Sequence, residues 1–77
     1  MLHMSEKDVG QRLRELRKDF GFSQEHLARE LDVTVSTVIK WERGDFYPGA
    51  KSLLVLIERF GVSMNWLLAG RGPKFAK

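Results

Sequence analysis

The chain has 77 residues, of which 43% are hydrophobic and 30% are charged, and its formal net charge is +3 at pH 7. This length allows one domain with a small core, and the composition is that of an ordered protein. The absence of cysteine excludes disulfides and cysteine-based metal sites and suits a reducing cytoplasm. No apolar run approaches the ~18 residues of a membrane span, and the first residues lack a secretory signal, so we expect a cytoplasmic protein with no membrane partner.

The sequence contains no pattern typical of catalysis, metal binding or cofactor binding. Its two histidines, His3 and His26, lack the His-x-x-x-His spacing of a metal site, and its carboxylates are scattered rather than paired. A Gly-rich phosphate loop and a G-x-S-x-G motif are both missing. We therefore expect neither an enzyme nor a cofactor. The positive charge is compatible with a nucleic-acid partner, but it is common among small domains and decides little.

The first predicted helix begins after Ser5. It opens the folded domain predicted at residues 6–70, and a flexible start is predicted at residues 1–5. An apolar stripe at helical spacing consists of Val9, Leu13, Leu16 and Phe20. Gly21 is the predicted C-terminal cap of this helix. On the opposite face, a solvated surface is predicted for Arg12, Arg14 and Lys18.

The stretch from residue 23 to residue 42 is predicted to form two short helices joined by a tight turn. Ser23 and Thr34 are the predicted N-caps, because a hydroxyl there can accept a hydrogen bond from a free backbone N–H. Asp32 stands where the first of these helices must stop, and aspartate tolerates the left-handed conformation that a sharp turn needs. The predicted buried residues are Leu27, Ala28, Leu31, Val38 and Trp41. The predicted outer residues of the second helix are Val35, Ser36, Ile39 and Lys40. A short helix with an exposed N-terminal half fits the major groove of DNA.

The remainder of the chain is predicted to form a loop, two helices and a tail. Residues 44–49 contain two glycines and a proline, which indicates a loop. The helix predicted at residues 50–60 has an apolar face made of Leu53, Leu54, Ile57 and Phe60, with Leu56 beside it. Val55 extends this apolar surface, which indicates either a helix buried on most sides or a surface for a partner. A last short helix is predicted at residues 64–69, and the tail at residues 71–77 is predicted to be a flexible basic extension or the start of a linker.

Several of these stretches together resemble the Cro and phage-repressor family of helix-turn-helix proteins, the XRE family. They are R-L-R-E-L-R at 12–17, G-F-S-Q-E-x-L-A at 21–28, V-x-x-S-T-V at 33–38, K-W-E-R-G at 40–44 and F-G-V-S-M-N-W-L-L-A-G at 60–70. The resemblance implies an all-α fold, a compact five-helix lambda-repressor-like bundle with a central helix-turn-helix. The sequence departs from the family at Asp32, where glycine is usual, and a strain of about 1 kcal/mol is predicted there.

The resemblance also implies which residues contact DNA. Its base-reading positions fall at Thr34, Val35, Ser36 and Lys40. Lys40 is the strongest candidate for base readout, because its ammonium can donate to guanine O6 and N7; a phosphate contact without sequence content is the alternative. Val35 can offer only an apolar contact, such as one to a thymine methyl group. The candidate phosphate contacts are Ser23, Gln24, Thr37, Arg43 and Tyr47, and packing is an equal alternative for Tyr47.

Further implications concern internal contacts and partners. The resemblance implies an ion pair between Arg17 and Glu42. Because one such domain reads only a few base pairs, we expect a homodimer that binds double-stranded DNA at a palindromic operator, with repression as the default outcome. The candidate dimer contacts are Val55, Trp66 and Leu67, and closure of the core is the alternative for Trp66. The alternative function is a protein-interaction module, such as an antitoxin, that binds a toxin or a fused effector domain through its C-terminal surface.

Overall fold

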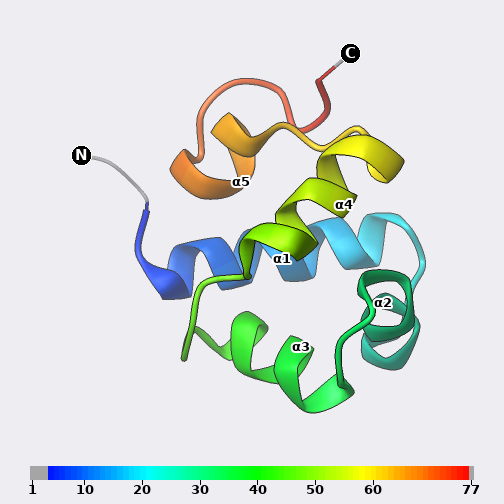
Figure 1. The fold of residues 1–77 in the computed structure, drawn as a ribbon. Helices are drawn as coiled ribbons and strands as arrows, with labels where there is room; N and C mark the ends of the chain where they lie inside the picture. The colour runs from blue at the N-terminus through cyan, green and yellow to red at the C-terminus, as the bar shows by residue number, and fades with distance from the viewer. Residues whose placement is uncertain (1–3, 77) are drawn as a thin grey trace.

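The computed structural model describes residues 4–76, and within this range the chain folds into five α-helices (Figure 1). The helices are α1 (Glu6–Asp19), α2 (Gln24–Leu31), α3 (Val35–Arg43), α4 (Ala50–Phe60) and α5 (Met64–Ala69). The predicted all-α architecture is therefore confirmed. No helix of this range is long and apolar enough to cross a membrane. Residues 1–3 of the predicted flexible start, and His3 with them, lie outside the described residues.

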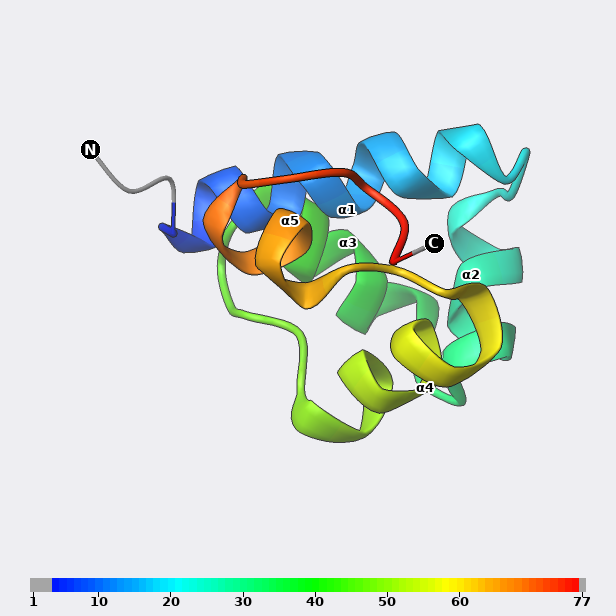
Figure 2. The same cartoon turned by 90° about the horizontal axis from the view of Figure 1, so that it is seen from above.

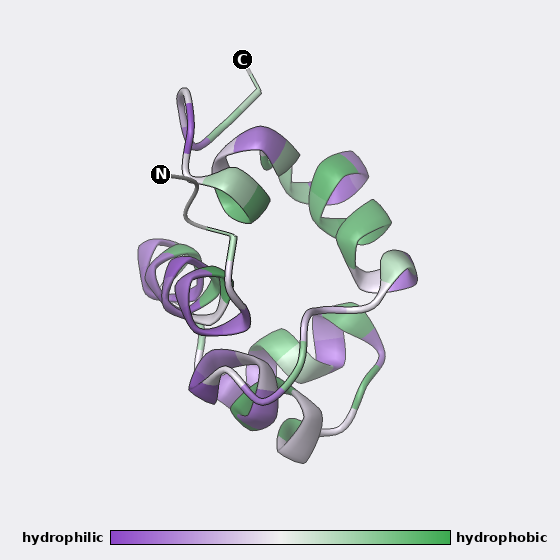
Figure 3. Ribbon diagram, turned by 90° about the vertical axis from the view of Figure 1, so that its left-hand side faces the viewer, coloured by the Kyte–Doolittle hydropathy of each residue, from purple (hydrophilic) through white to green (hydrophobic). Residues whose placement is uncertain are grey.

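The five helices surround one core. α1 crosses the middle of the molecule, with α2 and α3 on one side of it and α5 on the other (Figure 1). α4 lies across the core from α1 (Figure 2). These two helices differ in hydropathy: α1 is largely hydrophilic and α4 is largely hydrophobic (Figure 3). The buried core consists of Val9, Leu13, Leu16, Leu27, Ala28, Leu31, Val38, Trp41, Leu56, Val62 and Leu67.

Side-chain hydroxyls cap the N-termini of four of the helices. Ser5, Ser23, Thr34 and Ser63 each accept a hydrogen bond from the backbone N–H three residues further on. Each of these bonds satisfies a donor that the first turn of a helix leaves free. The N-caps predicted at Ser23 and Thr34 are therefore confirmed, and the boundaries of the helix-turn-helix follow from local hydrogen bonding.

The turn between α2 and α3 has the predicted left-handed residue. Asp32 has φ 57° and ψ 46°, and it is the only residue other than glycine with a positive φ in residues 4–76. The backbone N–H of Val33 donates to the carbonyl of Ala28 at 3.0 Å, which closes the C-terminal end of α2. The side chain of Asp32 is exposed. The strain at this position is therefore a backbone property of a residue that has a β-carbon.

A backbone contact between α1 and α3 was missed from the sequence. Gly10 is buried in the middle of α1, and a β-carbon added there would lie 2.3 Å from the carbonyl oxygen of Trp41 and 2.9 Å from that of Glu42. The two helices therefore approach each other at a distance that only glycine allows. A glycine inside an otherwise regular helical pattern was the available signal, because it weakens a helix unless packing requires it.

The side of α4 that was predicted to be buried was wrong: the buried side is rotated by part of a helical turn from the predicted one. Leu54 is 55% exposed and Ile57 is 40% exposed, whereas Leu56 is fully buried and Ser52 is 4% exposed. Leu53 and Phe60 are partly buried against the core, as predicted. Nearly every side of α4 is apolar, so hydrophobic periodicity alone could not indicate which side the rest of the domain would cover.

The C-terminal segment, predicted to be flexible, is folded back onto the domain. Residues 74–76 pair with residues 61–63 through two backbone hydrogen bonds of 2.8 and 2.9 Å. These bonds flank an antiparallel bridge between Val62 and Phe75. Phe75 also packs against the core. The glycine and proline at residues 72–73 therefore turn the chain back and do not release it.

Side-chain contacts also attach this segment to the rest of the domain. The ammonium of Lys74 lies 2.6 Å from Glu15 and also contacts Asp19, so it bridges two carboxylates of α1. It stands 5.2 Å from the ring centroid of Trp66. Hydrogen bonds to Asp19 and Glu15 raise the pKa of Lys74. Arg12, predicted to be solvated, instead donates from Nε to the carbonyl of Leu67 at 2.8 Å and so holds α5 against α1.

The close approach at Gly10 predicts the effect of a small substitution. Gly10→Ala should lower the free energy of unfolding by about 1–3 kcal/mol, because the new methyl group meets backbone atoms that cannot rotate away. Urea unfolding measures this change. Gln11→Ala is the matched control on the same helix, since Gln11 is exposed, and it should change stability by less than about 0.5 kcal/mol. Equal midpoints for the two variants would contradict the contact.

The left-handed turn predicts the opposite result at Asp32. Asp32→Gly should leave stability unchanged or raise it by up to about 1 kcal/mol, because glycine has no steric penalty in this conformation. Thermal unfolding of the two proteins, followed by circular dichroism, measures the change. A clear fall in Tm would mean that the Asp32 side chain itself stabilises the turn.

Candidate functional site

One side of α3 is exposed while the opposite side is buried. Val38 is fully buried and Trp41 is 6% exposed, so these residues fix the inner side of the helix. The exposed residues at and after its N-cap are Thr34, Val35, Ser36, Ile39 and Lys40. The four residues expected to read bases therefore lie together on the surface of one short helix. Val35 and Ile39, one turn apart, make part of this surface apolar.

A hydrogen-bonded pair of threonines organises the start of this surface. The hydroxyl of Thr34 accepts from the backbone N–H of Thr37 and lies 2.9 Å from the hydroxyl of Thr37. Both hydroxyls therefore take part in the cap of α3. Ser36 lies between them in the sequence, and its side chain is exposed.

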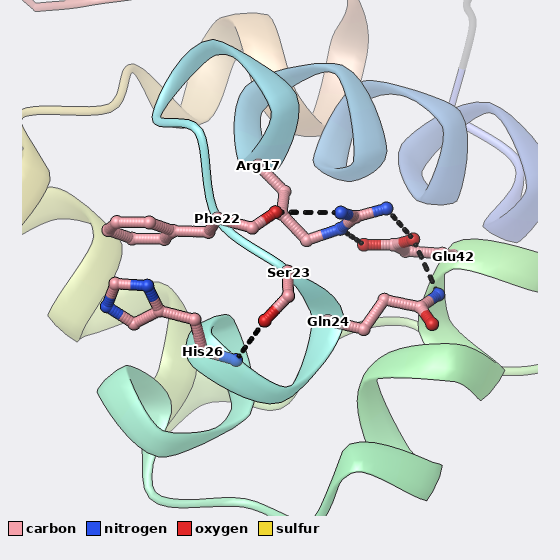
Figure 4. Close-up of polar contacts among 6 residues, drawn as sticks. All are labelled: Arg17, Phe22, Ser23, Gln24, His26 and Glu42. Carbon is pink, nitrogen blue, oxygen red and sulfur yellow. Dashed lines mark hydrogen bonds and ion pairs between the residues drawn. The ribbon is translucent and has the colours of Figure 1, made fainter.

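A buried ion pair connects α1 to the C-terminal half of α3 (Figure 4). Arg17 donates from Nε to Glu42 Oε2 at 2.6 Å and from Nη2 to Glu42 Oε1 at 3.1 Å. Its Nη1 donates to the carbonyl oxygen of Phe22 at 2.9 Å, in the turn that precedes α2. The side chains of Arg17 and Glu42 are 10% and 5% exposed. The ion pair implied by the family resemblance is thus present, and it is bidentate, the geometry that orients both side chains.

Gln24 adds α2 to the same network (Figure 4). Its amide Nε2 donates to Glu42 Oε1 at 3.1 Å. An amide nitrogen carries two hydrogens, so this bond leaves a second donor on Gln24. Ser23, directly before it, uses its hydroxyl to accept from the backbone N–H of His26. The first residue of α2 is therefore held by α3, with one amide hydrogen to offer to another acceptor.

The last residue of α3, Arg43, and Tyr47 in the loop after it are the other two predicted phosphate contacts. Arg43 donates from Nε to Asp45 Oδ2 at 3.0 Å, and this hydrogen bond raises the pKa of Arg43 and lowers the pKa of Asp45. Both side chains are on the surface. Tyr47 donates its hydroxyl hydrogen to the carbonyl oxygen of Met4 at 2.6 Å. In this arrangement Tyr47 tethers the start of the chain and does not offer its hydrogen to a phosphate.

The three predicted dimer contacts do not lie on one free surface. Leu67 is fully buried and belongs to the core, so its prediction as a dimer contact was wrong. Val55 and Trp66 are half-buried against the core, and Lys74 lies over the ring of Trp66. Large exposed apolar side chains occur instead at Leu54 and Ile57 on α4. A six-residue helix has few positions that can face outward when one of its sides must close the core.

A cleft of about 570 Å³ opens where α1, the start of α2 and the outer side of α3 meet. Arg14, Gln24, Ile39 and Arg43 line it, together with the buried network described above. Within residues 4–76, no group of three or more histidine, aspartate or glutamate side chains could hold a metal ion. The one carboxylate of this cleft, Glu42, is paired with Arg17, and the other charged and amide groups that line it are donors, which can bind an anion.

The chain is similar in sequence to helix-turn-helix proteins. A family model described as a helix-turn-helix domain matches residues 10–73. The HTH-type transcriptional regulator DicA of Escherichia coli (strain K12) is 37% identical over 66 residues, which cover 86% of this chain and 49% of that protein. The HTH-type transcriptional activator BcrR of Enterococcus faecalis is 35% identical over 63 residues, which cover 82% of this chain and 31% of that protein. The chain thus spans half or less of the length of these two relatives.

Solved structures with the same fold include a repressor bound to DNA. The P22 c2 repressor protein, in complex with a synthetic operator, superposes with a TM-score of 0.73 and 30% sequence identity. The match covers 82% of this chain and 96% of that chain. A transcriptional regulator from Listeria innocua superposes with a TM-score of 0.71 and 26% identity, over 86% of this chain and 61% of that chain. The predicted lambda-repressor-like arrangement of the helices is thereby confirmed.

The buried pair predicts a large effect of removing one partner. Glu42→Ala should lower the free energy of unfolding by about 3–5 kcal/mol, because the Arg17 guanidinium is then buried without a counter-charge. Glu30→Ala is the control, since it removes the exposed pair with Arg59 and should change stability by no more than about 1 kcal/mol. Urea unfolding at neutral pH compares the two. Similar losses for both variants would mean that the buried pair does not stabilise the fold.

Proposed function

This chain belongs to the family of helix-turn-helix domains, and from that membership we propose that it is a transcriptional regulator that binds specific sequences of double-stranded DNA. The observation that supports this function is the exposed side of α3, which presents polar and apolar groups on a helix fixed from behind by Val38, Trp41 and Glu42. A helix held this rigidly can enter a major groove with little loss of conformational entropy on binding.

The proposed base contacts come from the exposed side of α3. Lys40 donates to guanine O6 and N7, and Val35 packs on a thymine methyl group, because it has no polar atom to offer. Thr34 and Ser36 supply hydroxyls, which discriminate between bases only weakly. The exposure of all four side chains supports this assignment.

The proposed phosphate contacts surround this surface. Gln24 donates its second amide hydrogen to a phosphate at the positive end of α2, close to Ser23. Thr37 and Arg43 contribute from α3. Such contacts place the domain on the duplex and contribute affinity without reading sequence. Tyr47 is left out of this set, because its hydroxyl hydrogen is engaged by Met4.

A homodimer on a palindromic operator is the proposed binding form. One short helix reads only a few base pairs, so useful specificity requires a second copy about one helical turn, ~34 Å, away. Apolar side chains exposed on α4, Leu54 and Ile57 beside the half-buried Val55, support a contact between copies. Occupancy of an operator that overlaps a promoter would exclude polymerase, so repression is the proposed outcome.

The central test separates base reading from phosphate binding. Lys40→Ala should reduce the preference for one base pair by about 1–3 kcal/mol, whereas Gln24→Ala should weaken binding to all sequences alike. Selection of bound duplexes from a random pool, performed with the wild type and both variants, measures these preferences. An unchanged preference in Lys40→Ala would refute base reading by Lys40. Absence of any selected sequence for the wild type would refute the DNA-binding function itself.

A further inference from the structure

We propose that Arg14 is a further phosphate-contacting residue, and that the cleft it shares with Gln24 and Arg43 receives one phosphate of the DNA backbone. This inference rests on the proposed function, which it extends from α2 and α3 to α1. The sequence indicated only a solvated face for Arg14. The structure places this side chain at the meeting point of three helices, in the same cleft as two residues already proposed to bind phosphate.

Arg14 lines a second cavity of about 370 Å³ together with Lys18, but it is the one basic residue of that predicted face that also lines the cleft. Arg12 is turned toward α5, where it donates to the carbonyl oxygens of Leu67 and Leu68. Lys18 is exposed one turn beyond Arg14 and does not line this cleft. Arg14 alone among the three reaches the side of the molecule on which the N-terminus of α2 and the outer residues of α3 lie. Its role is therefore distinct from that of a general solvated surface.

The charges around the cleft favour an anion beside Arg14. Three arginines and one glutamate line the cleft. Arg17 is neutralised by Glu42 and Arg43 is paired with Asp45. Within residues 4–76, Arg14 has no carboxylate at ion-pair distance. Its positive charge is thus left for a ligand, and a guanidinium binds a phosphate through two parallel N–H bonds.

The position of the cleft suits a phosphate of a duplex bound to α3. Ile39 forms one wall of the cleft and is followed by Lys40, a proposed base contact. A backbone phosphate at the edge of the groove would therefore lie between α3 and Arg14, within reach of the Gln24 amide.

The experiment measures duplex affinity against salt concentration for the wild type, Arg14→Ala and Lys18→Ala. Arg14→Ala should weaken binding about 5–10-fold at physiological salt, equally for selected and unselected duplexes, and should reduce the salt slope by about 1. Lys18→Ala is the matched control, because Lys18 is an exposed basic residue of the same helix, α1, and this variant should leave the slope nearly unchanged. Circular dichroism verifies that both variants are folded, as expected for exposed positions.

A second measurement locates the contact. Single phosphates of the duplex are replaced in turn by neutral methylphosphonates. The replacement at one position should weaken binding of the wild type several-fold but have little further effect on binding of Arg14→Ala. Identical behaviour of Arg14→Ala and Lys18→Ala in both measurements overturns the role of Arg14 and leaves the proposed function standing. A wild type that binds no duplex at any salt concentration overturns both proposals.

Discussion

The orientation of α3 depends on one buried ion pair. Arg17 contacts Glu42 through two hydrogen bonds and the carbonyl of Phe22 through a third, so a single guanidinium joins α1, the turn before α2 and α3. Buried charges lose hydration, and the net stabilisation from such a pair is smaller than its Coulomb attraction. Its larger consequence is geometric, because a planar guanidinium with fixed donor directions allows little rotation of the groups it binds.

A second constraint acts on the same end of α3. The backbone of α1 at Gly10 touches the carbonyls of Trp41 and Glu42, at the residue that also carries the ion pair. Both constraints hold the C-terminal half of α3, and the outer side of its N-terminal half remains exposed. The left-handed Asp32 and the Thr34 cap determine where that free half begins. The side of α3 proposed to contact DNA is thus held at one end and presented at the other.

Local features of the fold could be predicted because each depends on residues close in sequence. A hydroxyl caps the N–H three residues later at Ser23 and Thr34, and Asp32 adopts the left-handed conformation between two apolar helical patterns. The outer side of α3 followed from the same reasoning, since Val38 and Trp41 define the inner side. The ion pair between Arg17 and Glu42 was predicted from family resemblance alone, because no local pattern connects residues that are 25 positions apart.

The sequence by itself determined the helices, their ends, the helix-turn-helix and its exposed side, since hydrogen bonds within one turn and periodic burial decide these. The tertiary structure alone decided which side of α4 is buried, that Leu67 closes the core, and that residues 74–76 return to pair with residues 61–63. It also decided that Arg12 and Arg14 have different surroundings. These outcomes depend on which distant element covers a given surface, and a pattern of apolar residues shows that a side can be buried without showing what buries it.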